Sequence, residues 1–122
     1  MRLGSIYEAV IAAASKHAGR VGATEHLPEF TTRARLFGDK VRTRHDELGL
    51  TERQLIERTG LSRSYVQLLL NNRGTAKHPD TGKHGPVNPT LDVIWRLSEA
   101  LDLDPAYLVD SDREVEHHPN GR

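Results

Sequence analysis

The sequence predicts an all-α fold, a bundle of five or six helices, and three observations support this prediction. Apolar residues recur at spacings of three and four along most of the chain, as they do on the buried face of an amphipathic helix. Residues that cap helices, and glycines that end them, stand at the borders of these segments. Outside residues 73–89, no segment carries the signals of a β-strand.

The first predicted helix covers residues 6–18. Ser5 and Glu8 have the spacing of a capping box, in which the serine oxygen accepts a backbone N–H three residues on and the glutamate reaches back. The polar, glycine-containing stretch that follows is expected to be a connector. We assign residues 1–30 to this N-terminal unit. Its helix would cap the bundle, pair with its copy in a homodimer, or bind a protein partner.

The next two helices are predicted over residues 32–48 and 52–59. Phe37 lies on the apolar stripe that the longer helix is expected to bury. Thr51 and Gln54 have the spacing of a second capping box, which fixes the start of the shorter helix. These two helices therefore follow each other after a very short connection.

A fourth helix is predicted over residues 63–72. Gly60 precedes it and suits a left-handed turn, and Ser62 is a natural N-cap. The following residues, 73–89, contain three glycines and three prolines, which exclude a regular helix. Residues 79–82, Pro-Asp-Thr-Gly, predict a turn. The extended loop is therefore compatible with a small hairpin-like flap or with an irregular insertion.

A helix over residues 91–102, capped by Thr90, is apolar over most of its circumference and is expected at the buried centre. An aspartate cap and Pro105 at the first helical position open a last short helix that ends near Leu108. Residues 110–122 are acidic and polar, and we expect them to form a flexible tail.

Composition excludes several classes of protein. The 122 residues include no cysteine, which removes disulfides, thiolate zinc sites and cysteine nucleophiles, and which fits a reducing cytoplasm. The longest apolar run, residues 9–14, is far shorter than the roughly 18 residues of a membrane helix, so we expect no membrane association. It is also too short for a signal peptide.

The formal net charge is zero, but the charges are unevenly distributed. Residues 33–90 hold eleven basic and six acidic side chains, a net charge of +5, whereas residues 91–122 carry a net charge of −5. A basic middle segment favours a polyanionic partner. A basic and an acidic surface that simply attract each other would give the same charge distribution. Charge alone therefore does not decide between this alternative and a polyanionic partner.

The stretch from 51 to 72 has the spacing of a helix-turn-helix, whose second helix enters the DNA major groove. At 100° per residue, Val66 and Leu69 fall on the buried side of this second helix. The opposite side gathers residues that can hydrogen-bond base edges or meet a thymine methyl group. These are Ser64, Gln67, Leu68 and Asn71, with Arg63 at the start of the helix.

From residue 37 to residue 108 the chain resembles the Cro/repressor-type helix-turn-helix family, also called the xenobiotic-response-element family of bacterial and phage regulators. The matching phrases are FGDKVR (37–42), GLT (49–51), GLSRSYV (60–66), NPTL (88–91), LSEAL (97–101) and DPAYL (104–108). The resemblance implies a DNA-binding domain over residues 31–109. It also implies a cytoplasmic, nucleoid-associated regulator that binds double-stranded DNA sequence-specifically as a repressor, one setting being phage or prophage immunity. Such regulators commonly bind DNA as dimers.

The resemblance also implies roles for single residues. Base contacts fall to Arg63, Ser64, Gln67 and Leu68, and phosphate contacts fall to Ser62, Asn71 and Arg73. In the loop, Lys77 and Lys83 would clamp phosphates like a wing, unless the loop is only a surface insertion. Several residues depart from the family pattern. Among them, Glu52 stands where a phosphate-binding glutamine is usual and would repel phosphate, and Arg44 stands where an apolar residue is usual.

Other chemistry is poorly supported by the sequence. The seven histidines have no metal-ligand spacing, and neither a phosphate-binding glycine loop nor a nucleophile elbow occurs. We therefore predict no enzyme activity, no cofactor and no metal. The main alternative is a protein-interaction module, such as an antitoxin, that binds its partner through residues 6–18.

Overall fold

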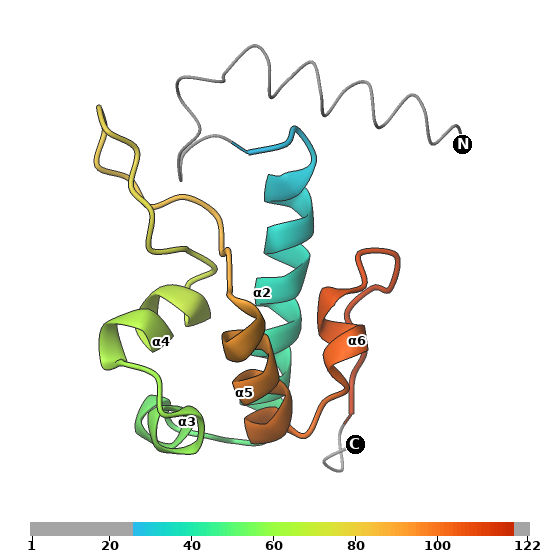
Figure 1. Cartoon of the computed structure of the whole chain (residues 1–122). Coiled ribbons are helices and arrows are strands. Elements are labelled where there is room, and N and C mark those ends of the chain that lie inside the picture. The colour runs from blue at the N-terminus through green and yellow to red at the C-terminus, as the bar shows by residue number, and fades with distance from the viewer. Residues whose placement is uncertain (1–25, 119–122) are drawn as a thin grey trace.

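The computed structural model of the chain describes residues 26–118 (Figure 1). This part contains five helices and no strand, so the prediction of an all-α fold is confirmed for it. The predicted helix over residues 6–18 lies outside the described residues. No helix in the described range is long and apolar enough to cross a membrane. The helices are α2 (Phe30–Glu47), α3 (Glu52–Thr59), α4 (Arg63–Leu70), α5 (Leu91–Leu101) and α6 (Pro105–Val109).

Local capping signals place the starts of α3, α4, α5 and α6 where the sequence predicts them, whereas α2 begins at Phe30, before the predicted residue 32, and has no side-chain cap. The Thr51 hydroxyl accepts from the Gln54 backbone N–H at 3.1 Å, and the Gln54 side chain accepts from the Thr51 N–H at 2.8 Å. Ser62, Thr90 and Asp104 cap the next three helices more simply, since each side chain accepts one backbone N–H of the first turn without a reciprocal bond. Such caps depend on residues within one helical turn, and so they can be read from the sequence.

Helix α4 ends two residues earlier than the predicted boundary at 72. Its last residue is Leu70, and Asn72 adopts a left-handed backbone with φ of +59°. The Asn72 side chain is held on α2, where its Nδ2 donates to the Arg35 carbonyl and to the Asp39 carboxylate, each at 3.0 Å. This contact fixes the end of α4 against α2, and it depends on a residue far away in the sequence.

All the described helices contribute to one apolar core. Helix α5 presents Ile94 and Leu97 to this core, but Trp95 is 54% exposed and Leu91 is 73% exposed. The prediction that this helix is buried on most of its surface is therefore wrong, because its neighbours cover one side only. The apolar side chains with under 2% exposure are Val41, Leu55, Val66, Leu69, Val87, Leu97, Leu101 and Leu108.

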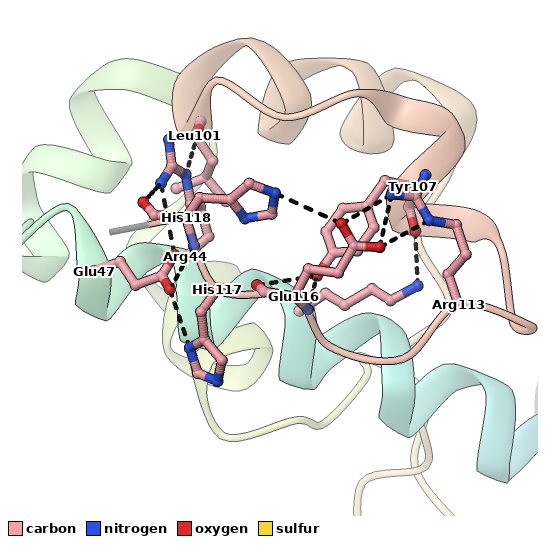
Figure 2. A network of polar contacts seen from close by, with 9 residues as sticks. Arg44, Glu47, Leu101, Tyr107, Arg113, Glu116, His117 and His118 are labelled. Atoms are coloured by element: carbon pink, nitrogen blue, oxygen red, sulfur yellow. Dashed lines mark hydrogen bonds and ion pairs between the residues drawn. The ribbon is translucent and has the colours of Figure 1, made fainter. Parts of the chain in front are cut away.

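Two buried cations on α2 bind the ends of other helices. Lys40 and Arg44 are each 1% exposed. Lys40 Nζ donates to the carbonyl oxygens of Tyr107 at 2.7 Å and Asp110 at 2.8 Å. Arg44 Nε donates to the Leu101 carbonyl at 2.8 Å (Figure 2). The carbonyls at the C-terminal ends of α5 and α6 lack partners within their own helices, and these cations satisfy them.

The segment after α6 folds back over the bundle, whereas the sequence predicted a flexible tail from residue 110. The Tyr107 hydroxyl accepts from the Glu116 backbone N–H at 2.8 Å, and the Glu47 carboxylate accepts from the His118 N–H at 2.9 Å. Arg44 also donates to the His118 carbonyl at 2.7 Å (Figure 2). Residues 110–118 are therefore joined to α2 and α6 by hydrogen bonds.

The loop between α4 and α5 is hairpin-like, although it forms only one isolated antiparallel bridge, between Lys77 and His84. The backbone N–H of Gly74 donates to the Gly85 carbonyl at 2.8 Å, which closes the base of the loop. A Cβ at Gly74 would lie 2.1 Å from the Pro86 carbonyl oxygen, so this close approach requires glycine.

Candidate nucleic-acid interface

Helix α4 is fixed in place by α3 and by the core. Its connection to α3 begins at Gly60, whose φ of +73° is favourable for glycine. Val66 and Leu69 are buried at 0% and 1% exposure, and so they fix the rotation of α4 about its axis. In Figure 1, α3 and α4 lie on one side of α5, and α6 lies on its other side. Helix α4 therefore lies on the opposite side of α5 from α6.

The outer surface of α4 carries the residues to which the sequence assigned base contacts. Arg63, Ser64 and Gln67 are exposed, whereas Leu68 is half-buried and presents less apolar surface than the helical projection suggested. Burial raises the pKa of Tyr65, which favours its neutral phenol. Since α4 contains no acidic residue, Arg63 is its only charged side chain.

The predicted phosphate ligands at the two ends of α4 are partly engaged in capping. The Ser62 hydroxyl oxygen accepts from the Tyr65 backbone N–H at 3.2 Å, and it lies 3.5 Å from the Ser64 hydroxyl oxygen, where either hydroxyl can donate. Asn71 Nδ2 donates to the Gln67 carbonyl at 2.8 Å, which leaves one amide hydrogen for an external acceptor. Both side chains are exposed.

The basic residues assigned to DNA contacts are not neutralised by neighbouring acids. Among residues 26–118, Arg63, Arg73, Lys77 and Lys83 make no ion pair and no side-chain hydrogen bond, and all four are exposed. Four other arginines of the described residues do have acidic partners, and the pairs are Arg33 with Glu29 at 3.0 Å, Arg53 with Glu57 at 3.3 Å, Arg96 with Asp92 at 2.7 Å and Arg113 with Glu116 at 2.7 Å.

The sequence reasoning missed Arg35. This exposed arginine of α2 has no partner for its guanidinium within the described residues. It lines a hollow of about 240 Å³ together with Arg73, Asn72 and His84, at the base of the loop. The sequence pointed to Arg35 as a DNA contact only through its place in the basic middle segment. Its proximity to Arg73 could not be predicted, because it depends on the contact between Asn72 and α2.

Glu52 makes a contact that sequence reasoning did not foresee. Its Oε1 accepts from Nε2 of Gln67 at 3.0 Å, so the first residue of α3 is joined to the outer surface of α4. The sequence predicted that this carboxylate would repel phosphate, and that expectation stays a prediction. The contact shows a second role for the side chain, as a hydrogen-bond acceptor for Gln67.

The described residues offer little for metal chemistry, since no three histidine, cysteine or acidic side chains gather there at ligating distance. His84 Nδ1 lies 2.9 Å from the Gly74 carbonyl oxygen, and His78 Nδ1 accepts from the Asp80 and Thr81 backbone N–H groups at 3.2 and 3.4 Å. The loop histidines therefore stabilise the loop itself.

Comparison with known proteins finds no family model, no curated protein and no solved structure that matches this chain.

Proposed function

We propose that this protein is a sequence-specific double-stranded DNA-binding regulator of transcription, acting as a repressor of the Cro/repressor type. One observation carries the proposal. The exposed basic side chains of α4 and of the loop that follows it have no acidic partner among the described residues; they are Arg63 on the helix and Arg73, Lys77 and Lys83 in the loop. Unpaired, exposed cations can bind the phosphates of duplex DNA, and a neighbouring helix without acidic residues can approach the base edges in its major groove.

The proposed mechanism divides the work between phosphates and bases. Helix α4 spans eight residues, about 12 Å, and an α-helix fits the major groove of B-form DNA. Arg63, Ser64 and Gln67 then reach base edges and supply sequence preference. Arg73 and the two loop lysines neutralise phosphates, which releases counterions and supplies affinity. Arg35 extends this basic surface onto α2.

The direct test is selection of duplexes from a random pool by the full chain at moderate salt, followed by sequencing. We expect one enriched motif, and Arg63→Ala should lose roughly 1–3 kcal/mol of discrimination at one or two base pairs. Arg33→Ala is the matched control, because Arg33 is paired with Glu29 and its guanidinium also contacts Ser111 on the α6 side. Equal weakening on all sequences would contradict base reading by Arg63.

The alternative, a protein-interaction module of the antitoxin kind, would act through residues 6–18, outside the described part of the chain. A cytoplasmic, nucleoid-associated location and a homodimer remain proposals that follow from the DNA-binding role. Failure of the full chain to enrich any duplex would favour the interaction module.

A further inference from the structure

The hydrogen bond between Glu52 and Gln67 has a chemical direction. A carboxylate has only acceptor oxygens, so the 3.0 Å contact with Glu52 Oε1 requires the amide nitrogen of Gln67 and not its amide oxygen. Glu52 is half-buried at the start of α3, where the capping box of Thr51 and Gln54 fixes the backbone. The acceptor therefore sits on a rigid element beside α4, and it sets which end of the Gln67 amide lies toward α3.

A fixed amide distinguishes bases that a freely rotating amide would not. One hydrogen of Nε2 is taken by Glu52, and the amide oxygen and the second hydrogen remain available. Adenine offers a donor, N6, and an acceptor, N7, in the major groove, which match these two groups. Guanine and thymine offer the oxygen acceptors O6 and O4, which would meet the amide oxygen unfavourably.

We propose that Glu52 is a positioning residue that fixes the amide of Gln67 so that Gln67 selects adenine in the major groove. The inference rests on the proposed DNA-binding function and deepens it by naming the base that one side chain selects. The proposal also assigns a role to the Glu52 carboxylate, which would repel a phosphate at this position.

The isosteric substitution Glu52→Gln tests the proposal without changing the size of the side chain. A glutamine at this position can accept from the Gln67 nitrogen or donate to its oxygen, so both orientations of the Gln67 amide become available. We expect the preference for adenine over guanine to fall about fivefold or more at the base pair that depends on Gln67, as defined by loss of preference in Gln67→Ala. Preferences at the other base pairs should persist.

The matched control is Glu57→Gln, which removes the same charge from the same helix. Glu57 is exposed and pairs with Arg53 at 3.3 Å, and no hydrogen bond joins it to Gln67. Its substitution should leave every base preference unchanged, although weaker repulsion would raise affinity on all sequences. The double variant Glu52→Gln with Gln67→Ala should show no further loss at that base pair beyond Gln67→Ala alone.

The outcomes separate the two proposals. If the wild-type chain enriches no motif from a random pool of duplexes, the DNA-binding proposal fails and the role of Glu52 fails with it. If a motif is enriched but Glu52→Gln only shifts affinity uniformly, as Glu57→Gln does, the positioning role alone is wrong. Thermal unfolding monitored by circular dichroism verifies that each variant is folded before its DNA preferences are compared.

Discussion

At the scale of single residues, Lys40 is one of two cations that are almost fully buried in the described part of the protein. It is 1% exposed, donates to two carbonyls at 2.7 and 2.8 Å, and lies 4.5 Å from the centroid of the Tyr107 ring. Burial lowers the pKa of Lys40, which Asp110 partly offsets. The cost of burying this charge is therefore met by hydrogen bonds and by the aromatic ring.

Replacing Lys40 by methionine, Lys40→Met, should keep the packing and remove both hydrogen bonds. The carbonyls of Tyr107 and Asp110 would then lack their partner, and we expect the free energy of unfolding to fall by about 2–3 kcal/mol. Urea denaturation measures the change. Arg42→Met is the control on the same helix, and its exposed side chain should change stability by less than about 0.5 kcal/mol. Equal effects of the two substitutions would contradict the assigned role.

Glu47 gives the fold a dependence on pH. Burial raises the pKa of its carboxyl, but hydrogen bonds from the His118 backbone N–H, from His117 and from Arg44 lower it more, so the pKa lies below its ordinary value of 4.5. The unfolded chain consequently binds this proton at a higher pH than the folded chain does. The stabilisation is therefore present above about pH 4.5 and is lost as the pH falls through the folded pKa.

Glu47→Gln should lower the free energy of unfolding by about 1 kcal/mol at pH 7, because the amide still accepts a hydrogen bond but without charge. The difference from wild type should shrink as the pH falls below 4.5, where the wild-type carboxylate is lost. Urea titrations at a series of pH values measure both effects. Glu57→Gln should follow the wild-type profile, since an exposed ion pair contributes little. A constant difference at all pH values would show that the charge of Glu47 is unimportant.

At the scale of elements, the helices differ in how far the sequence determines them. The bounds of α3 could be predicted because Thr51, Gln54 and Gly60 act within one turn of the helix ends. The end of α4 could not, because Asn72 reaches across to α2. Trp95 and Leu91 were expected to be buried, but burial depends on neighbouring helices, and those cover only the other side of α5. The outer residues of α4 were predictable because Val66 and Leu69 fix its rotation.

The loop between α4 and α5 is the element whose proposed role in DNA binding is easiest to test separately. Lys77 and Lys83 are exposed and unpaired within the described residues, and they lie on opposite arms of the loop, so their removal should not disturb the core. Lys77→Ala with Lys83→Ala should lower affinity on all sequences and reduce the slope of log affinity against log salt by roughly 2. Fluorescence anisotropy with a labelled duplex over a range of salt concentrations measures the slope. An unchanged slope would mean that the loop does not contact phosphate.

At the scale of the whole molecule, the positive charge of residues 33–90 and the negative charge of residues 91–122 are carried by different elements. The unpaired cations assigned to DNA contacts lie on and beside α4 and its loop, whereas the acidic residues of the negatively charged region lie on α5, in the connection between α5 and α6, and in the segment after α6. The sequence could not predict the path of that segment, because its hydrogen bonds join residues more than 70 positions apart, such as Arg44 and His118. We expect the acidic region to weaken binding to random DNA.

Neutralisation tests this expectation better than truncation, because removing residues 110–118 would also remove partners of Arg44 and Glu47. Asp112 and Glu114 are exposed, and Asp112→Asn with Glu114→Gln removes two charges while keeping side-chain size. Affinity for a random-sequence duplex should rise roughly two- to threefold at low salt, and the gain should disappear at high salt, where charges are screened. Anisotropy titrations at both salt concentrations provide the measurement. An equal affinity at low salt would exclude any effect of the acidic region.

The hydrogen bonds of the two buried cations also determine the order in which contacts can form while the chain is being synthesised. Helix α2 leaves the ribosome early, but the carbonyls that Lys40 and Arg44 require belong to residues 101–118. Arg44 and His118 are 74 positions apart, which corresponds to about 4–15 s of translation. The hydrogen bond between Arg44 and the His118 carbonyl can therefore form only after residue 118 has emerged from the ribosome, later than the last core residue, Leu108.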